Sequence, residues 1–429
     1  MRSSLASASA LALTLIAGCG DDGSTSNGGT GTATTTGATG ATGASTGATA
    51  GTESGSDGST SGSGTSTGTS TTRGGATETQ GTSTSTTGDT STSGTTGPVA
   101  CEDMPELCNA LDDNCNGLYD EGCDCTPPDL DLVAIDGYTA RVVTEISKDV
   151  GNYGYLGDVE RAVGEYWGEP GEGVLFTVNT PGNTSGGIGK IDQDGAFKGW
   201  LVDPAAAKLP INPYLEYAYG GILYACSTVG GNWIYKIFPD GTVEQVVQHG
   251  ECEGLIYGDR GDGTMALYAS NYITSQIARI DEDGTRTVLV TDPVNLSVIV
   301  DLAIPHPESA FKPGLYGINQ TALGVHRLDT EGKLTLEYPY SSGFGIGEEM
   351  SFPDPKSAFR DHFYHLSVTN QAVVRVKPDG TWEEVITGPK LNYGIYSTGG
   401  VFSSNGAYYF FTNEDALIMR LQACSIAGQ

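Results

Sequence analysis

Basic residues are scarce in this 429-residue chain, which has 21 Lys and Arg against 52 Asp and Glu and a net charge of −31. Six of the acids and two of the bases fall in the first 98 residues, which leaves 46 acids, 19 bases and a net charge of −27 in the rest. A surface this acidic repels phosphate backbones and attracts cations. We therefore expect no nucleic-acid partner and assign most of the charge to solubility.

Long apolar runs are confined to the N-terminus. Residues 1–18 combine Arg2, the apolar run Leu11–Ile16 and small residues before Cys19, which is typical of a secretory signal peptide. The segment Ile16-Ala17-Gly18-Cys19 resembles the bacterial lipobox, in which the Cys is acylated and becomes the mature N-terminus; the alternative is an ordinary signal peptide with a chance Cys. Lipid at Cys19 would anchor the exported protein to a membrane of the cell envelope. No other segment is apolar enough to span a bilayer.

Several catalytic signatures are also missing. The five His residues have no spacing typical of a zinc site; they are His249, His306, His326, His362 and His365. The chain has no Gly-x-Ser-x-Gly motif and no Gly-rich loop before a helix. Serine hydrolysis and nucleotide chemistry are therefore disfavoured.

Residues 19–98 form a segment without hydrophobic periodicity. From Gly20 to Gly97 the chain is almost entirely Gly, Ser, Thr and Ala, which cannot bury a core, so we expect disorder. A flexible chain of that length reaches roughly 50 Å, and we interpret it as a tether between membrane and folded part.

A short phrase then repeats six times: apolar, any residue, Lys or Arg, apolar. Its basic residues step along the chain by 46, 43, 48, 48 and 45 positions; they are Lys190, Lys236, Arg279, Arg327, Arg375 and Arg420. An aromatic residue precedes each by about a dozen positions; these are Phe176, Tyr224, Tyr268, Tyr316, Tyr364 and Tyr409. Short strands at this period predict an all-β, six-bladed β-propeller over residues 127–429.

Turn signals follow the first five repeats but not the sixth. An acidic residue and Gly stand after each basic strand, as in Asp194-Gly195 and Asp240-Gly241, which is a hairpin signal. The sixth repeat ends before an outer strand can form. We predict that an N-terminal segment, Tyr138 to Ile146, supplies that strand and closes the ring, so that few sheet edges stay exposed.

A Cys-rich segment, residues 99–126, lies between tether and propeller. Its oxygen-bearing residues stand at alternate positions around Gly117, an arrangement that suits Ca²⁺; they are Asp112, Asn114, Asn116, Asp120 and Glu121. The segment resembles the metal-binding repeat of secreted bacterial proteins and the calcium-binding thrombospondin type-3 repeats. The alternative is an Asx-rich turn held by disulfides without a metal.

Eight cysteines remain after Cys19, and an even number in an exported protein indicates disulfides. Cys101, Cys108, Cys115 and Cys123 are expected to form two bonds, with three pairings open. We predict a Cys226–Cys252 bond between the second and third blades. Cys125 and Cys424 are then left over, and a bond between them would lock the ring.

Three carboxylates share one position in the repeat. Glu253, Asp301 and Glu349 are 48 residues apart, and each stands 15 residues before its blade's Tyr. Each opens the predicted innermost strand, so they should surround one mouth of the channel, with Asn271 and Asn319 ending the neighbouring strands. Like charges this close need compensation, so either a cation such as Ca²⁺ sits among them or each acid is solvated separately.

Residues 129–424 resemble six-bladed propellers of the gluconolactonase and strictosidine-synthase group and NHL-repeat propellers. The resemblance rests on the six strand phrases and the acidic-Gly turns. It implies a calcium ion in the channel mouth, for which Glu253, Asp301 and Glu349 match ligand positions, while the first blade offers only Asp158 or Glu160.

The sequence supports a surface lipoprotein whose propeller binds a protein or a glycan. A second hypothesis is a calcium-dependent lactonase-like hydrolase with one of the three carboxylates as base. A purely structural envelope protein is the third. The mouth discriminates among them, because an enzyme needs the carboxylates to converge on one ion and a binding protein needs only a shaped surface.

Overall fold

The computed structural model describes residues 128–153, 156–169, 171–320, 324–355, 357, 359–388, 391, 400–402, 407–412 and 416–423. The predicted signal peptide, tether and Cys-rich module therefore lie outside the described residues, as does Cys424. Within these ranges no helix is long and apolar enough to cross a membrane.

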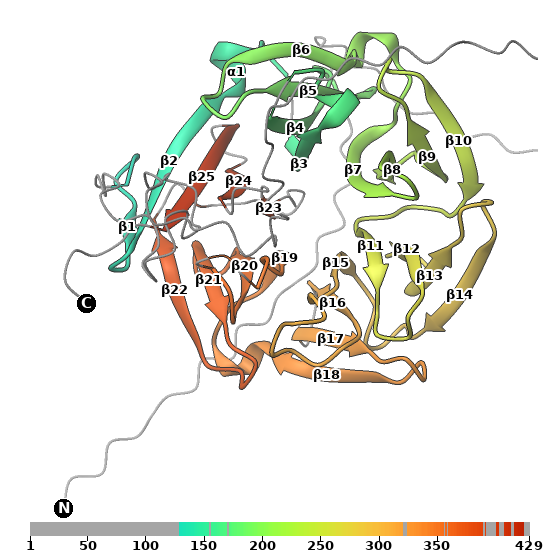
Figure 1. The fold of residues 1–429 in the computed structure, drawn as a ribbon, viewed down its shortest axis with the longest axis vertical. Coiled ribbons are helices and arrows are strands. Elements are labelled where there is room, and N and C mark those ends of the chain that lie inside the picture. Colours follow the sequence, from blue (N-terminus) through green and yellow to red (C-terminus); the bar gives the residue numbers. More distant parts are fainter. Residues whose placement is uncertain are drawn as a thin grey trace, which may run out of the picture. The chain divides into compact units, whose positions relative to one another are not determined.

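Six antiparallel sheets stand around a common axis (Figure 1), which confirms the six-bladed β-propeller. The strands of each blade succeed one another from the axis outward. Blade 1 has β3 (Leu156–Val163), β4 (Glu172–Asn179), β5 (Gly186–Ile191) and β6 (Phe197–Val202). Blade 2 has β7 (Ile211–Ala218), β8 (Ile222–Val229), β9 (Trp233–Ile237) and β10 (Val243–Gln248). Blade 3 has β11 (Leu255–Asp259), β12 (Met265–Asn271), β13 (Gln276–Ile280) and β14 (Arg286–Thr291).

The other three blades follow the same order. Blade 4 has β15 (Ile299–Ala303), β16 (Leu315–Asn319), β17 (Gly324–Leu328) and β18 (Leu334–Pro339). Blade 5 has β19 (Gly347–Ser351), β20 (Phe363–Ser367), β21 (Ala372–Val376) and β22 (Trp382–Thr387), with β1 (Val133–Ala134) added outside. Blade 6 has β23 (Gly400–Phe402), β24 (Tyr408–Thr412), β25 (Leu417–Ala423) and β2 (Tyr138–Glu145). The short helical elements are α1 (Ile146–Asp149), η1 (Gly164–Tyr166), η2 (Pro204–Ala206) and η3 (Tyr340–Ser342).

The ring closes through the N-terminal strand, as the sequence predicted. Strand β2 is the outer strand of blade 6 and pairs antiparallel with β25 from Tyr138 opposite Ala423 to Glu145 opposite Leu417. The N-terminal and C-terminal segments of the propeller therefore lie in one sheet (Figure 1). This pairing removes an edge that would otherwise offer unpaired backbone groups.

The repeated phrase forms the third strand of every blade, and the repeated aromatic lies on the second. Tyr268 stands opposite Arg279, and the same pairing recurs in blades 4, 5 and 6. These aromatics are buried between blades. The hairpin glycines after the third strands all have positive φ, between 77° and 89°; they are Gly195, Gly241, Gly284, Gly332 and Gly380. Because a residue with a Cβ resists this conformation, the turns explain the recurring Gly.

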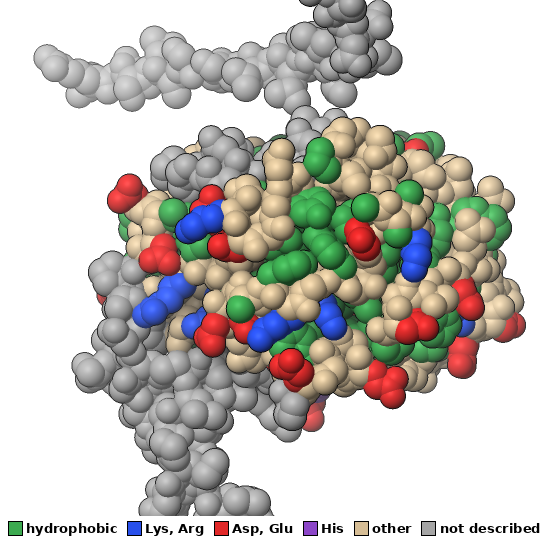
Figure 2. All heavy atoms as spheres, turned by 90° about the horizontal axis from the view of Figure 1, so that it is seen from above, with side chains coloured by type: hydrophobic (Ala, Val, Ile, Leu, Met, Phe, Trp, Pro, Cys, Tyr) green, Lys and Arg blue, Asp and Glu red, His purple; other side chains and the backbone are tan. Residues whose placement is uncertain are grey.

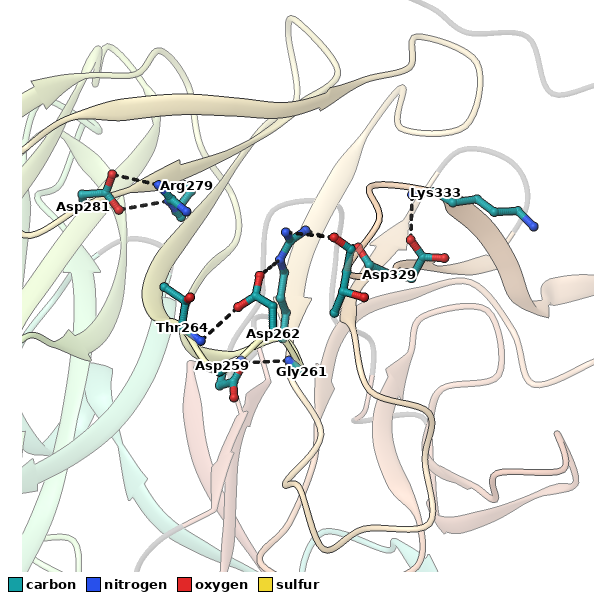
Figure 3. Close-up of polar contacts among 11 residues, drawn as sticks. Asp259, Gly261, Asp262, Thr264, Arg279, Asp281, Asp329 and Lys333 are labelled. Atoms are coloured by element: carbon teal, nitrogen blue, oxygen red, sulfur yellow. Dashed lines mark hydrogen bonds and ion pairs between the residues drawn. The ribbon is translucent and has the colours of Figure 1, made fainter.

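Polar contacts join the turn between β11 and β12 in blade 3 to the turn between β17 and β18 in blade 4. Arg260, after β11, pairs with Asp262 at 2.9 Å and donates to the backbone carbonyls of Asp329 and Thr330 in blade 4, at 3.2 and 3.3 Å. Figure 3 shows this network beside the Arg279–Asp281 ion pair. On the edge of the propeller seen in Figure 2, acidic and basic side chains are interspersed. Several described basic side chains are thus paired with nearby surface acids.

Candidate carboxylate channel

The innermost strands surround a cavity of about 260 Å³ along the propeller axis. We call it the channel cavity. All three predicted carboxylates, Glu253, Asp301 and Glu349, line it. Three further acids line it as well: Asp158 and Glu160 on β3 and Glu216 on β7. Among the described lining residues Arg161 is the one basic residue, and it pairs with Glu172 at 3.4 Å.

The three predicted carboxylates do not share one position in their sheets. Asp301 pairs with Ile318 and Glu349 with Leu366, in each case two residues after the repeated Tyr. In blade 3, Leu255 pairs with Ala269 directly after Tyr268, so Gly254 takes the equivalent position and Glu253 stands one residue earlier. The hairpin between β11 and β12 is one residue shorter, and equal spacing in the sequence therefore hides a shift of register.

Asp158 and Asp301 connect neighbouring blades in the same way. Asp158 accepts hydrogen bonds from the backbone N–H of Val159 at 2.8 Å and of Leu215, on β7, at 2.7 Å. Asp301 accepts from Leu302 at 2.7 Å and from Met350, on β19, at 2.8 Å. In each carboxylate, one oxygen thus accepts a hydrogen bond from an N–H of its own strand, and the other accepts one from an N–H of the next blade.

Glu349 and Glu216 also make contacts between blades. Glu349 Oε1 accepts from the hydroxyl groups of Tyr408, on β24, and Ser351, both at 3.0 Å. The backbone N–H of Tyr257, on β11, donates to Glu216. These two acids therefore help to hold adjacent blades together, and both also line the cavity.

Glu253 is the exception, because its buried Oε2 has no hydrogen-bond partner among the described residues. It follows Cys252, which forms a disulfide with Cys226 across blades 2 and 3, as predicted from the sequence. The backbone N–H of Cys252 also donates to the Ser227 carbonyl at 3.0 Å. The disulfide thus fixes the loop that carries Glu253 into the cavity.

Burial raises the pKa of these acids because a low-dielectric environment disfavours the charged form. Burial, with the nearby Glu251 adding to it, raises the pKa of Glu253 to about 8. Burial raises the pKa of Asp301 to about 7 and that of Glu160 to about 7. The pKa values of Asp158 and Glu216 are also raised by burial, and neighbouring carboxylates add to both effects. Near neutral pH the cavity therefore holds both protonated and ionised carboxyl groups.

The predicted amides lie elsewhere. The side-chain amide of Asn271 donates to the His249 carbonyl at 2.7 Å and its oxygen accepts from the Thr274 N–H at 3.0 Å. Asn319 donates to the Asn295 carbonyl at 2.6 Å. Neither Asn271 nor Asn319 lines the channel cavity. They hold the loops outside the inner strands, because the second strand ends one layer farther from the axis than the first begins.

A calcium site at the mouth does not emerge from the described side chains. Within the described ranges no three His, Cys, Asp or Glu side chains form a group that could hold a metal ion. Calcium prefers six to eight converging oxygens. Both carboxylate oxygens of Asp158 and of Asp301 already accept hydrogen bonds from backbone N–H groups.

The sequence pointed to half of the acids that line the channel cavity. Glu216 has no counterpart at its repeat position, so spacing alone could not find it. For the first blade the sequence offers Asp158 and Glu160, but it does not fix their position in the repeat. A signal for both was available, because alternate residues on β3 face the same side of the sheet.

No protein-family model and no curated protein matches this chain. Solved structures do resemble it. A streptogramin B lyase is 16% identical, with 67% of this chain and 98% of that chain covered and a TM-score of 0.46. A gluconolactonase from Xanthomonas campestris is 11% identical, with 68% and 91% covered and a TM-score of 0.47. A protein of unknown function from Bacteroides thetaiotaomicron is 12% identical, with 66% and 76% covered and a TM-score of 0.50.

At these identities the likeness concerns the fold alone. The Bacteroides structure, with a TM-score of 0.50, supports the propeller fold. Fold and cavity together define the class: a six-bladed β-propeller with buried carboxyl groups around its axis. What such a cavity does must be argued from its own side chains, because one fold hosts many functions.

The raised pKa of Glu253 predicts a pH-dependent stability. Its pKa rises from an ordinary 4.5 to about 8 in the folded protein. Stability present below pH 4.5 is therefore lost as the pH rises through about 8, since ionisation in the folded state is unfavourable. We expect Glu253→Gln to raise the free energy of unfolding by about 1–3 kcal/mol at pH 9 relative to the parent protein, and much less at pH 5.

Urea denaturation at both pH values measures this difference. Glu244→Gln is the matched control, because Glu244 is exposed on β10. Parallel pH profiles for the parent protein and Glu253→Gln would contradict the assignment of a buried, uncompensated carboxyl group.

Proposed function

We propose that this protein is an envelope-anchored binding protein whose propeller takes a sugar unit of a glycan into the channel cavity. The observation that carries the proposal is the lining of that cavity, in which carboxyl groups alternate with apolar and aromatic side chains. Its volume of about 260 Å³ lies slightly below the roughly 300–1,000 Å³ typical of small-molecule pockets, which favours a small ligand unit. A folded partner could insert only a single side chain there, whereas a sugar ring matches the space.

The aromatic part of the lining suits the apolar C–H face of a sugar ring, and the carboxyl groups suit its hydroxyl groups. Phe352 and Phe402, both partly exposed, offer surfaces on which the C–H face of a sugar ring can pack. Ionised carboxylates accept hydrogen bonds from hydroxyl groups, and such charge-assisted bonds are strong. Glu253, with its raised pKa, is mainly protonated near pH 7 and can donate a hydrogen bond instead. The cavity therefore offers both donors and acceptors.

A calcium-dependent hydrolase receives no comparable support. Such an enzyme would need carboxylate oxygens free to bind one ion, and Asp158 and Asp301 use theirs to join blades. We therefore favour binding over lactone or ester hydrolysis.

Filling the cavity should weaken glycan binding. Ile256 lines the cavity on β11, so Ile256→Trp should place an indole in the space for the sugar. We expect at least a tenfold loss of binding on an array of neutral and acidic oligosaccharides. Val288→Trp, at a position 41% exposed on β14, is the control and should bind like the parent protein.

Two outcomes would contradict the proposal. One is a parent protein that binds no saccharide on the array, and the other is an Ile256→Trp variant that is folded and binds as well as the parent. Hydrolysis of lactones by the parent protein, lost in Ile256→Trp, would instead favour an enzyme.

Lipid anchoring of the chain is a separate proposal that rests on the lipobox at Ile16–Cys19. Cys19→Ala removes the thiol to which a lipid would attach, so the variant should leave the membrane fraction and lose labelling by an alkyne fatty acid. A variant that stays labelled and membrane-bound would show that Cys19 is not the anchor.

Calcium binding by residues 99–126 is likewise a proposal drawn from its ligand spacing. Asp112→Asn with Asp120→Asn removes two charged ligands, so a calcium site measured by calorimetry on the full chain should weaken at least tenfold. Glu102→Gln, outside the ligand set, is the control. Identical isotherms for the double variant and the parent protein would contradict this proposal.

A further inference from the structure

A second cavity, of about 430 Å³, lies between blades 2 and 3, outside the channel. We call it the blade 2–3 pocket. Its walls come from the end of β10, the loop from His249 to Glu251, the turn between β12 and β13, and the side chains of Gln276 and Arg286. No residue of this pocket takes part in the channel cavity.

Arg286 sits in this pocket without an acidic partner among the described residues. Its Nε donates to His249 Nδ1 at 3.1 Å and its Nη2 donates to Gln276 Oε1 at 2.8 Å, so both acceptors are neutral groups. Among the described ion pairs Arg286 has none, whereas Arg279, Arg327 and Arg375 each pair with a carboxylate. An arginine left unpaired in so acidic a chain retains a planar donor edge that suits a carboxylate.

His249 keeps this geometry fixed. The residue is buried, and its Nε2 donates to the Ser270 carbonyl at 2.8 Å, which leaves Nδ1 as the acceptor for Arg286. Burial, with the positive charge of the Arg286 guanidinium adding to it, lowers the pKa of His249 to about 4. The ring is therefore neutral at physiological pH and orients the guanidinium without competing as a second cation.

The opposite side of the pocket favours hydroxyl groups. Glu251 lines it and accepts a hydrogen bond from the hydroxyl of Tyr272. Asn232, Gln248 and Thr274 add amide and hydroxyl groups to the lining. Ile273, 62% exposed, adds an apolar surface. With one cation and one anion, the pocket suits a ligand that carries a single carboxylate and several hydroxyl groups.

We propose that the blade 2–3 pocket binds a uronic acid unit of a glycan, with its carboxylate on Arg286 and its hydroxyl groups toward Glu251 and the amides. This inference rests on the proposed function in that the ligand is a saccharide. The same loop connects the two sites, because Glu251 lines this pocket and Glu253 lines the channel cavity, with the disulfide-bonded Cys252 between them.

The test compares trigalacturonate with neutral galactotriose by calorimetry on the full chain. We expect trigalacturonate to bind the parent protein and Arg286→Gln to weaken it at least tenfold, with any galactotriose binding unchanged. Arg286→Lys keeps the charge but loses the planar donor edge and should recover only part of the affinity. Arg279→Gln, an equal change of charge at an ion pair outside the pocket, should have no effect.

Thr274→Trp tests the pocket independently of Arg286, in case the Arg286 variants misfold. Thr274 is exposed and lines the pocket, so a Trp at this position should fill the pocket without disturbing the fold. Loss of trigalacturonate binding in both Thr274→Trp and Arg286→Gln supports the proposal. Unchanged binding in both overturns it, as does a parent protein that does not bind trigalacturonate. If Ile256→Trp alone removes saccharide binding, the channel proposal stands and the pocket proposal fails. If only Arg286→Gln and Thr274→Trp remove it, the pocket proposal stands and the channel proposal fails.

Discussion

The burial of carboxyl groups around the propeller axis constrains the rest of this structure. Six acids line one small cavity, and the only basic side chain in its described lining is already paired with Glu172. A buried charge without a partner is costly, so each acid must be protonated or hydrogen-bonded. The described contacts use both solutions: backbone N–H groups satisfy Asp158 and Asp301, and raised pKa values keep other groups neutral over part of the physiological range.

The hydrogen bonds of these acids also position the blades. Asp158 connects blades 1 and 2, Glu216 connects 2 and 3, Asp301 connects 4 and 5, and Glu349 connects 5 and 6. Closure by β2 brings the last blade against the first, so these contacts can form around a complete ring. Among the described acids of the cavity, Glu253 alone keeps a buried oxygen without a hydrogen-bond partner, so that oxygen takes no part in joining the blades.

The repeat pattern was sufficient to predict the architecture. Six basic third strands, five acidic-Gly turns and the missing outer strand of the sixth repeat together implied a six-bladed ring closed by the segment from Tyr138, and β2 occupies that place. Cys226 and Cys252 could be paired because each lies at the end of a strand on one face of the ring. These features depend on local turn chemistry and strand period, which a sequence displays directly.

The site was harder to predict, because it depends on register between strands. A hairpin shorter by one residue moves Glu253 away from the position of Asp301, although their spacing in the sequence is regular. The amides of Asn271 and Asn319 looked like channel ligands, but they hold backbone loops. Arg286 carries no motif at all, and its significance comes from having neutral acceptors and no ion pair within the described structure, which only three-dimensional packing can reveal.

A carbon-detected NMR titration of the side-chain carboxyl groups, with Glu253→Gln used to assign the Glu253 signal, tests the account most directly. The structure predicts that Glu253 titrates near pH 8, with Asp301 and Glu160 near pH 7. Ordinary titration of all three near pH 4 would show that the axis is open and well solvated. The channel would then have no buried carboxyl groups with which to bind a ligand.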